Sequence, residues 1–525
     1  MAKISTSPKF KSYSPKQGLL LPPSLEELIG AKHLVRVVEE VVESMDISDL
    51  INLYAGGGTT AYHPRMLLKV LLYAYSMKIY TGRKIAQALN QDIHFMWLSG
   101  MNRPDFRTIN NFRSSKAKEV IEILFEEMLD FLMFHNYIKM EHYFCDGSTF
   151  RADGNQHKMV WKKNAERYKA GTEEKCRALF KEIDELNNAE DRQYGKGNLE
   201  EQGETTTVTR EAIREQVERL DDQLKNAATQ RRRRKAVTLK KRLSEADNNL
   251  AKYDRQLTNA GNRGGYNVTD QDATAMRMKN KVEVLPAYNV MAGSEQQFIT
   301  GVSVHQNPND GVCLKDHLKQ VIPLQPFKPG SIVADSIFGT EQNYELLKTY
   351  EIENYMKFPA YYKEQTKSFK EDAFLKDNFP YNVLEDSYQC PDGRQLIYVG
   401  QYNEIHKRTG YQSTIKEYKC VDCSNCPFYD QCCKSTTGQP RSIQMNEKLE
   451  AYKQQARQNL NTGKGIKLKK QRGVEIESCF GDIKHNMGFR RFHLRGLRKV
   501  QTEINLVAMA HNIRKICLQR QRKAS

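Results

Sequence analysis

The sequence predicts a multidomain α/β protein, and three regional patterns lead to that prediction. Residues 24–135 have a helical periodicity of apolar positions. Short apolar runs typical of strands recur between residues 142 and 358, with turn signals between them. Residues 164–262 interrupt these runs with a dense mixture of Lys, Arg, Glu and Gln at the spacing of long helices. A chain of 525 residues has room for roughly two to four such domains.

The composition indicates a polyanionic partner and a reducing compartment. The formal net charge is +17, which suggests nucleic acid, although an ordinary basic protein would have the same value. The first residues contain no apolar signal segment, and no run of about 18 apolar residues occurs. Six of the 11 cysteines fall between Cys390 and Cys433, which favours metal ligation over disulfides. We therefore expect a cytoplasmic protein.

Several short helices are expected before residue 138, after a loose arm over residues 1–20. The start signals of three of them are Pro64, Thr81 and Pro104. In the third helix we expect Arg107 and Arg113 to face outward. Short helices with arginines on one side are typical of a helix-turn-helix DNA-binding unit. A plain helical bundle fits this pattern equally well.

The charged region over residues 164–265 is expected to be an inserted helical hairpin or coiled coil. The apolar positions that follow a 3-4 spacing are Ala236, Leu239, Leu243, Ala246, Leu250, Tyr253 and Leu257. A basic block, Arg231 to Lys235, precedes them. We assign the insertion a structural role, with contact to DNA or a partner through this block as the alternative.

The remaining strands are expected on both sides of a short helix. Two strands, 284–292 and 297–304, are expected to form a hairpin joined by a Gly-Ser turn. A helix is expected over 312–321. A short apolar strand, 331–335, and a further strand, 352–358, complete the predicted core.

Two aspartates are expected at the ends of core strands. Asp146 ends the strand that begins at His142, and Asp335 ends the later apolar strand. A third carboxylate, Glu477, lies seven residues before Lys484, so that a helix would present both on one face. Carboxylates of this kind hold Mg²⁺ or Mn²⁺, and two such ions can activate a water or a DNA 3′-hydroxyl. For any single aspartate, a cap or turn role is the alternative.

The order of these elements resembles the ribonuclease H-like core of DDE transposases, in particular bacterial insertion-sequence transposases. The stretches that carry the resemblance are Tyr62 to Leu68, Pro104 to Ile109, Asp146 to Thr149, Thr269 to Ala273, Val333 to Asp335 and Phe480 to Phe492. The resemblance implies nicking at transposon ends followed by strand transfer, with two Mg²⁺ or Mn²⁺ ions. Carried over to this sequence, the catalytic triad is Asp146, Asp335 and Glu477.

The sequence departs from the pattern of this family just before the third carboxylate. Many relatives have an arginine four residues before the glutamate, where this chain has Gly473 and places Arg472 one residue further away. Lys469 stands where relatives have a tyrosine. Glu475 is therefore an alternative third ligand. We prefer Glu477 because its spacing to Lys484 is that of the family.

The cysteine cluster predicts a structural Zn²⁺ site. Paired C-x₂-C spacing is what a tetrahedral thiolate site requires, and relatives often carry a similar zinc-ribbon-like insertion. The expected ligands are Cys390, Cys423, Cys426 and Cys432, with Cys420 as the alternate.

The C-terminal region is strongly basic and is expected to bind the DNA backbone. Residues 486–525 contain a single acid, Glu503, which makes a solvated helix face a poor alternative. The expected phosphate contacts are Lys484, Arg490, Arg491 and Arg495. Arg83 and Arg107 are expected to read the DNA ends.

The sequence is expected to divide into six segments with one overall function. The segments are 1–138 (helical DNA-binding domain), 139–163 and 266–358 (the two parts of the core), 164–265 (charged helical insertion), 359–452 (zinc-ribbon-like insertion) and 453–525 (final core helices and basic tail). The expected function is transposition, with double-stranded DNA as partner and a homodimer or higher oligomer on it. The alternatives are a metal-dependent nuclease without strand transfer and an inactive or domesticated DNA-binding protein.

Overall fold

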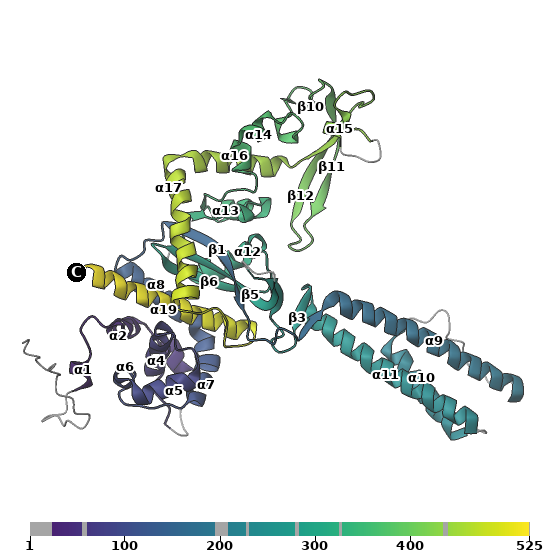
Figure 1. Cartoon of the computed structure of the whole chain (residues 1–525), viewed down its shortest axis with the longest axis horizontal. Helices are drawn as coiled ribbons and strands as arrows, with labels where there is room; N and C mark the ends of the chain where they lie inside the picture. Colours follow the sequence, from purple (N-terminus) through teal and green to yellow (C-terminus); the bar gives the residue numbers. More distant parts are fainter. Residues whose placement is uncertain are drawn as a thin grey trace, which may run out of the picture.

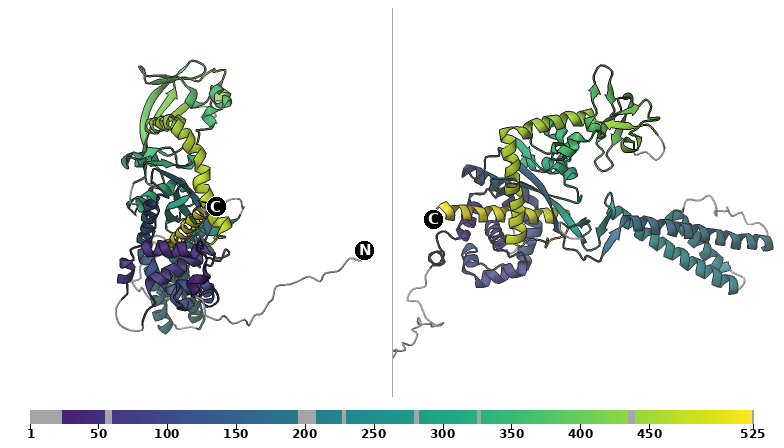
Figure 2. Two further views of the ribbon diagram at one scale, coloured as in Figure 1. Left: turned by 90° about the vertical axis from the view of Figure 1, so that its left-hand side faces the viewer. Right: turned by 45° about the horizontal axis from the view of Figure 1, so that its top comes forward.

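The computed structural model shows a helical and mixed-sheet body from which two extensions project (Figure 1). It describes residues 24–54, 60–194, 208–226, 230–278, 283–324, 328–433 and 439–523. The arm expected over residues 1–20 lies outside these residues. One extension is an arm of long helices, and the other is a small β unit joined to the body by a helix (Figures 1 and 2).

The chain begins with a set of helices, most of them short, and the last of the set, α8, is the longest. Their bounds are α1 Leu25–Leu28, α2 Leu34–Ser44, α3 Ser48–Asn52, α4 Pro64–Ser76, α5 Gly82–Gln91, α6 Ile93–Leu98, α7 Phe106–Asn111, the π-helical turn η1 Phe112–Lys116 and α8 Ala117–Phe134. The predicted starts are confirmed, because Pro64 is the first residue of α4 and Thr81 caps α5. Asp105 caps α7 through the backbone N–H of Thr108, at 2.7 Å.

The central sheet is mixed, with the strand order β4-β5-β1-β7-β8 and β6 paired to β5. The strands are β1 His142–Arg151, β4 Thr274–Arg277, β5 Val284–Glu295, β6 Phe298–His305, β7 Ser331–Val333 and β8 Glu353–Asn354. The strand β1 is antiparallel to β5 and parallel to β7. The connecting helices are α12 Asp310–Val321, η2 Ile322–Leu324, η3 Ser336–Phe338 and α13 Glu341–Thr349. This arrangement is consistent with a ribonuclease H-like core.

The hairpin of β5 and β6 turns later than expected. The predicted Gly-Ser turn is wrong, because Gly293 and Ser294 are both paired within the sheet. The chain instead turns at Gln296 and Gln297, which have φ angles of 54° and 60°. Gly293 is needed for packing, since a Cβ there would lie 1.7 Å from the ring of Tyr143.

The strand expected over 352–358 is limited to Glu353 and Asn354. The regular pairing of β8 with β7 covers only Ser331 and Ile332. Beyond it, the backbone N–H of Tyr355 still donates to the oxygen of Ile332 at 2.9 Å. The backbone N–H of Met356 instead donates to the side chain of Asn354 at 2.8 Å, so the ladder does not continue regularly.

The last helix, α19 (Leu497–Lys523), joins the N-terminal helices to the sheet. It packs against α2, α4 and α8 on one side and β6 on the other. A single apolar cluster contains residues of all these elements. The N-terminal helices therefore share a core with the sheet and do not form a separately packed unit.

The expectation that Arg113 faces outward is wrong. Its side chain is buried, and it donates hydrogen bonds to the hydroxyl of Tyr75 at 2.9 Å and to the backbone oxygen of Tyr80 at 2.8 Å. The Tyr75 hydroxyl in turn donates to the buried carboxylate of Glu503 at 3.2 Å. Arg113 lies four residues after the buried Ile109, so helical spacing places both on the inner face.

The charged insertion is helical, and its two ends lie together. The helices α9 Lys162–Tyr194, α10 Arg210–Asn226 and α11 Gln230–Ala260 pack around an apolar cluster that includes Leu239 and Leu243. At the base, β2 Met159–Trp161 pairs with β3 Gly265–Asn267. This pairing lets the arm project without separating the strands of the core (Figure 1).

The second extension is a five-stranded sheet with the order β13-β12-β11-β10-β9. Its elements are β9 Tyr381–Asn382, β10 Ser387–Gln389, β11 Gln395–Ile405, β12 Gln412–Cys420, α15 Tyr429–Cys432 and β13 Ser442–Met445, preceded by η4 Lys363–Gln365, α14 Lys367–Glu371 and η5 Lys376–Asn378. The chain returns to the body through α16 Glu447–Asn461 and α17 Gly463–Arg472. None of the described helices meets the length and apolarity that a membrane span requires.

Candidate active site

Asp146 lies in the middle of β1, not at its end as expected. The pairing of β1 with β7 stops at Phe144 and Val333, so this edge of β1 is unpaired where Asp146 follows. Side chains two residues apart in a strand share a face, and Asp146 and Ser148 line the same hollow. The short neighbouring strand therefore exposes Asp146 as a strand end would.

Asp335 lies two residues after the end of β7 at Val333, close to the strand end where the sequence predicts it. Its carboxylate caps η3 by accepting the backbone N–H of Ser336 at 2.8 Å. Burial opposes its ionisation, but Lys357 at 3.0 Å, the Ser336 N–H and Arg472 together hold the pKa of Asp335 below its usual range. Asp335 is therefore ionised at neutral pH.

The two candidate glutamates point in different directions. Both lie in a π-helical turn, η6 Gly473–Glu477, which continues into α18 Ser478–Gly481 and a second π-helical turn, η7 Asp482–Asn486. Glu475 is buried and accepts hydrogen bonds from the backbone N–H of Gln297 at 2.6 Å and the side chain of Gln471 at 2.9 Å. The Glu477 side chain is 55% exposed and lines the hollow with Asp146 and Asp335.

Arg472 lies among the three carboxylates. Its Nη2 atom is 3.1 Å from Glu477 and 3.5 Å from Asp335, and its Nη1 atom is 3.7 Å from Asp146. The Arg472 side chain is only 12% exposed. In the sequence, Arg472 differs from the family pattern by one position, and its location among the carboxylates could not be predicted from that difference.

A fourth carboxylate, Asp310, also lines the hollow. It is the first residue of α12 and accepts a hydrogen bond from Asn289 at 2.6 Å. It lies over β1 so closely that a Cβ at Gly147 would be 2.3 Å from its Oδ1 atom. The run Asn307-Pro-Asn-Asp310 is typical of a turn, and no signal in a single sequence connects Asp310 to Asp146.

The hollow has a volume of about 480 Å³. Its lining residues are Asp146, Ser148, Asp310, Asp335, Ile337, Arg472, Glu477 and Phe480. Oxygen donors of this kind suit Mg²⁺ or Mn²⁺. Among the residues that the structure describes, no three His, Cys, Asp or Glu side chains form a ready-made metal site. Here the carboxylates fit a divalent ion in chemistry and charge, with the guanidinium of Arg472 between them.

The basic residues after the triad lie beside the same strand. Lys484 donates to the hydroxyl of Ser148 at 2.6 Å and to the backbone oxygen of Thr149 at 2.9 Å. The backbone around Arg491 pairs with Arg151 at the end of β1. The half-exposed side chains of Arg491 and Arg495 both contact Asp153.

Arg490 is exposed and donates to the backbone oxygen of Lys484 at 2.9 Å. Arg83 and Arg107 lie elsewhere, on α5 and α7, where their guanidinium groups flank the ring of Phe106 at 5.2 Å and 5.7 Å. The structure thus places Lys484 beside Ser148, which lines the hollow, and places Arg491 and Arg495 near the end of β1. Arg83 and Arg107 lie together around Phe106.

An ion pair connects the helical segment that follows Glu477 to α19. Asp482 lies 2.8 Å from the buried His511 of α19, and this contact lowers the pKa of Asp482 to about 2 against the effect of burial. Burial opposes protonation of His511, but Asp482 and Cys479 raise its pKa to about 10. The other ring nitrogen lies 3.1 Å from the backbone oxygen of Gln297, so the pair ties this helix to the hairpin turn.

The predicted zinc ligands all lie in the small β unit. Cys390 follows β10, Cys423 and Cys426 lie in the loop after β12, and Cys432 ends α15. The alternate, Cys420, belongs to a small apolar cluster against which Cys390, Cys423 and Cys432 pack.

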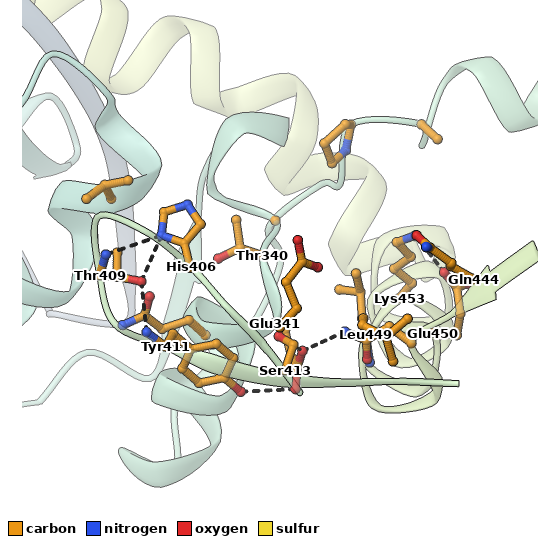
Figure 3. Close-up of a pocket in the computed structure, with 18 of the residues that line it drawn as sticks. Thr340, Glu341, His406, Thr409, Tyr411, Ser413, Gln444, Leu449, Glu450 and Lys453 are labelled. Carbon is orange, nitrogen blue, oxygen red and sulfur yellow. Dashed lines mark hydrogen bonds and ion pairs between the residues drawn. The ribbon is translucent and has the colours of Figure 1, made fainter. Parts of the chain in front are cut away.

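A second hollow, of about 510 Å³, separates the β unit from the body (Figure 3). The buried carboxylate of Glu341 lies in its wall and accepts hydrogen bonds from Tyr411 at 3.1 Å, Ser413 at 2.6 Å and Asn446 at 2.7 Å. These contacts fix the hairpin of β11 and β12 against α13. Glu341 therefore has a structural role.

Two family models match parts of the chain. Residues 389–517 match the family described as "Transposase DDE domain". Residues 23–115 match "Transposase domain (DUF772)". No curated protein matches the chain. The first match includes Arg472 and Glu477, and the second covers most of the N-terminal helices.

Proposed function

We propose that this chain, two parts of which match transposase family models, is a DDE-type insertion-sequence transposase that cuts DNA at the ends of a bacterial mobile element and joins them to target DNA. The observation that carries the proposal is the meeting of Asp146, Asp335 and Glu477 at one hollow from three separate segments. Families of this kind are generally dependent on divalent metals. The chain would act as a homodimer or higher oligomer on DNA of the nucleoid.

In this proposal the three carboxylates hold Mg²⁺ or Mn²⁺. Two such ions, when bound, activate the attacking oxygen of a water or a DNA 3′-hydroxyl and stabilise the leaving oxygen. Asp335 is suited to this role because Lys357 and Ser336 keep it ionised and fixed in orientation. Lys484, next to Ser148 at the rim, supplies a cation for a DNA phosphate.

The experiment that tests the function supplies pre-cut element ends and a target plasmid with Mg²⁺. We expect joined products from the wild-type chain and none from the Glu477→Gln variant. Hydrolysis of the ends without joining would support a metal-dependent nuclease instead. DNA binding without either reaction would support an inactive DNA-binding protein.

We also propose a division of labour in DNA binding, supported by the two separate groups of arginines. Replacing Arg490 and Arg491 together with alanine should weaken binding to all duplexes alike, because phosphate contacts carry no sequence information. The slope of log affinity against log salt should flatten by about two units, at about 0.9 per phosphate lost. Filter binding across a salt series measures this slope.

The matched variant in this experiment is Arg83→Ala combined with Arg107→Ala. It should reduce the preference for element ends over scrambled duplexes and should keep nonspecific affinity. Loss of sequence preference in the C-terminal variant, with an unchanged salt slope, would reverse the two roles.

We further propose a structural Zn²⁺ held by Cys390, Cys423, Cys426 and Cys432, with Cys420 as the alternate. The proposal is supported by the C-x₂-C spacing and by the packing of four of these five cysteines in one small cluster. Elemental analysis of freshly purified, reduced protein should find about one zinc per chain. If the purified protein contains no zinc, this proposal is wrong.

A further inference from the structure

We propose that Arg472 is the counterion of the carboxylate triad before metal binding, and that a divalent ion must displace its guanidinium to enter the site. This inference rests on the proposed function, because it assumes that Asp146, Asp335 and Glu477 hold the metal. It assigns Arg472 a positioning role that opposes metal binding in the free protein.

The position of the guanidinium supports this role. One side chain lies within 4 Å of carboxylate oxygens from three different segments of the chain. Carboxylates that share a site repel one another, and Asp310 adds a further negative charge to the same hollow. Arg472 lines this hollow as well, so its positive charge offsets the repulsion where the metal would otherwise do so.

The π-helical turn explains how Arg472 reaches this position. In an α-helix, residues three or four apart share a face, and residues five apart do not. The turn η6 Gly473–Glu477 has the wider i→i+5 pattern, so Arg472 and Glu477 become neighbours on one side of the helix. In a regular helix, the residue at position 473 would lie next to Glu477. With the π-helical turn, Arg472 takes that place, five residues before Glu477.

The contacts of Arg472 are those of a displaceable group. Its Nη1 atom is buried and has no hydrogen-bond partner among the described residues, since Asp146 at 3.7 Å is beyond hydrogen-bond distance. Its Nη2 atom makes one hydrogen bond, to Glu477 at 3.1 Å. The buried Arg113, by comparison, donates three side-chain hydrogen bonds, to Tyr75, Tyr80 and Asn110. The carboxylates also have other partners, because Asp335 keeps Lys357 and Ser336 when Arg472 leaves.

A metal ion and this guanidinium cannot share the hollow at low energy. Both would lie within about 4 Å of the same oxygens, where like charges repel strongly in a partly buried site. Removing the positive charge should therefore tighten metal binding, whereas removing a purely structural arginine would distort the site and weaken it.

The experiment measures Mn²⁺ binding to the full chain by electron paramagnetic resonance, together with thermal unfolding in EDTA and in Mn²⁺. For Arg472→Gln we expect Mn²⁺ affinity to rise about tenfold or more. In EDTA this variant should unfold at a lower temperature than the wild type, because the carboxylates lose their counterion. Mn²⁺ should raise its unfolding temperature by more than it raises that of the wild type.

Two further variants make the result specific. Arg457→Gln removes an arginine that is also paired with a carboxylate, Glu364, but outside the hollow, and should leave Mn²⁺ affinity unchanged. Arg472→Lys keeps the positive charge and should stay close to the wild-type affinity. Unchanged or weaker Mn²⁺ binding by Arg472→Gln would overturn the inference. If Glu477→Gln binds Mn²⁺ with the same affinity as the wild type, the proposed metal site itself is overturned.

Discussion

Glu477→Gln is expected to lower DNA cleavage by about a thousandfold or more, because it removes a charge that the metal-dependent step requires. The same loss is expected for Asp146→Asn and Asp335→Asn. Folding and DNA binding should persist, since the Glu477 side chain is more than half exposed and its ion pair among the described residues is with Arg472. A cleavage assay on duplexes with element ends, alongside circular dichroism and binding measurements, checks this expectation.

Glu475→Gln is the matched control, two residues away in the same π-helical turn. Its buried carboxylate accepts two hydrogen bonds that hold the turn of β5 and β6, so its loss should lower the free energy of unfolding by about 1–3 kcal/mol. The folded fraction should still cleave DNA. A stable but inactive Glu475→Gln variant together with an active Glu477→Gln variant would exchange the two assignments.

The second large effect is expected at Arg113, where the N-terminal helices meet α19. Arg113→Met should lower the free energy of unfolding by about 3–5 kcal/mol, because it leaves the buried Glu503 carboxylate without its nearest cation. The Tyr75 hydroxyl and the Tyr80 backbone oxygen would lose their donor as well. Denaturant unfolding monitored by circular dichroism measures the change.

Arg107→Met, six residues earlier and exposed, is the control for this prediction. It should change the free energy of unfolding by less than about 0.5 kcal/mol. Equal effects of the two substitutions would contradict the buried network, and would indicate that the N-terminal helices fold independently of α19.

Local signals in the sequence predicted those parts of the structure that depend on near neighbours. The starts of α4 and α5 follow from Pro64 and Thr81, since both act through backbone groups within one turn. The position of Asp335 near a strand end was predicted because a short apolar run leads up to it. The resemblance to transposases is confirmed by the matches at both ends of the chain.

The parts that could not be predicted depend on long-range packing or on irregular backbone. Asp310 reaches the hollow only because α12 packs over Gly147, which no periodicity shows. Arg472 reaches it through a π-helical turn, whose extra residue per turn has no signature in composition. Gly293 resembled a turn residue, and only the approach of Tyr143 reveals its packing role.

The charge of a side chain did not predict whether the side chain is buried. Arg113 was assigned to the surface because arginine is rarely buried, yet its spacing from Ile109 indicated the inner face. Glu475 and Glu477 have the same side chain. In the sequence, only the family spacing to Lys484 favoured Glu477 as the third metal ligand. Their burial and hydrogen bonds now give a physical basis for the same preference.

We propose that three carboxylates from separate segments form one metal site. Anomalous diffraction from crystals of the chain soaked in Mn²⁺ would locate the ion. We predict a peak in contact with Asp146, Asp335 and Glu477, with the guanidinium of Arg472 moved out of the hollow. A peak elsewhere on the chain, or no peak at this hollow at saturating Mn²⁺, would contradict the account.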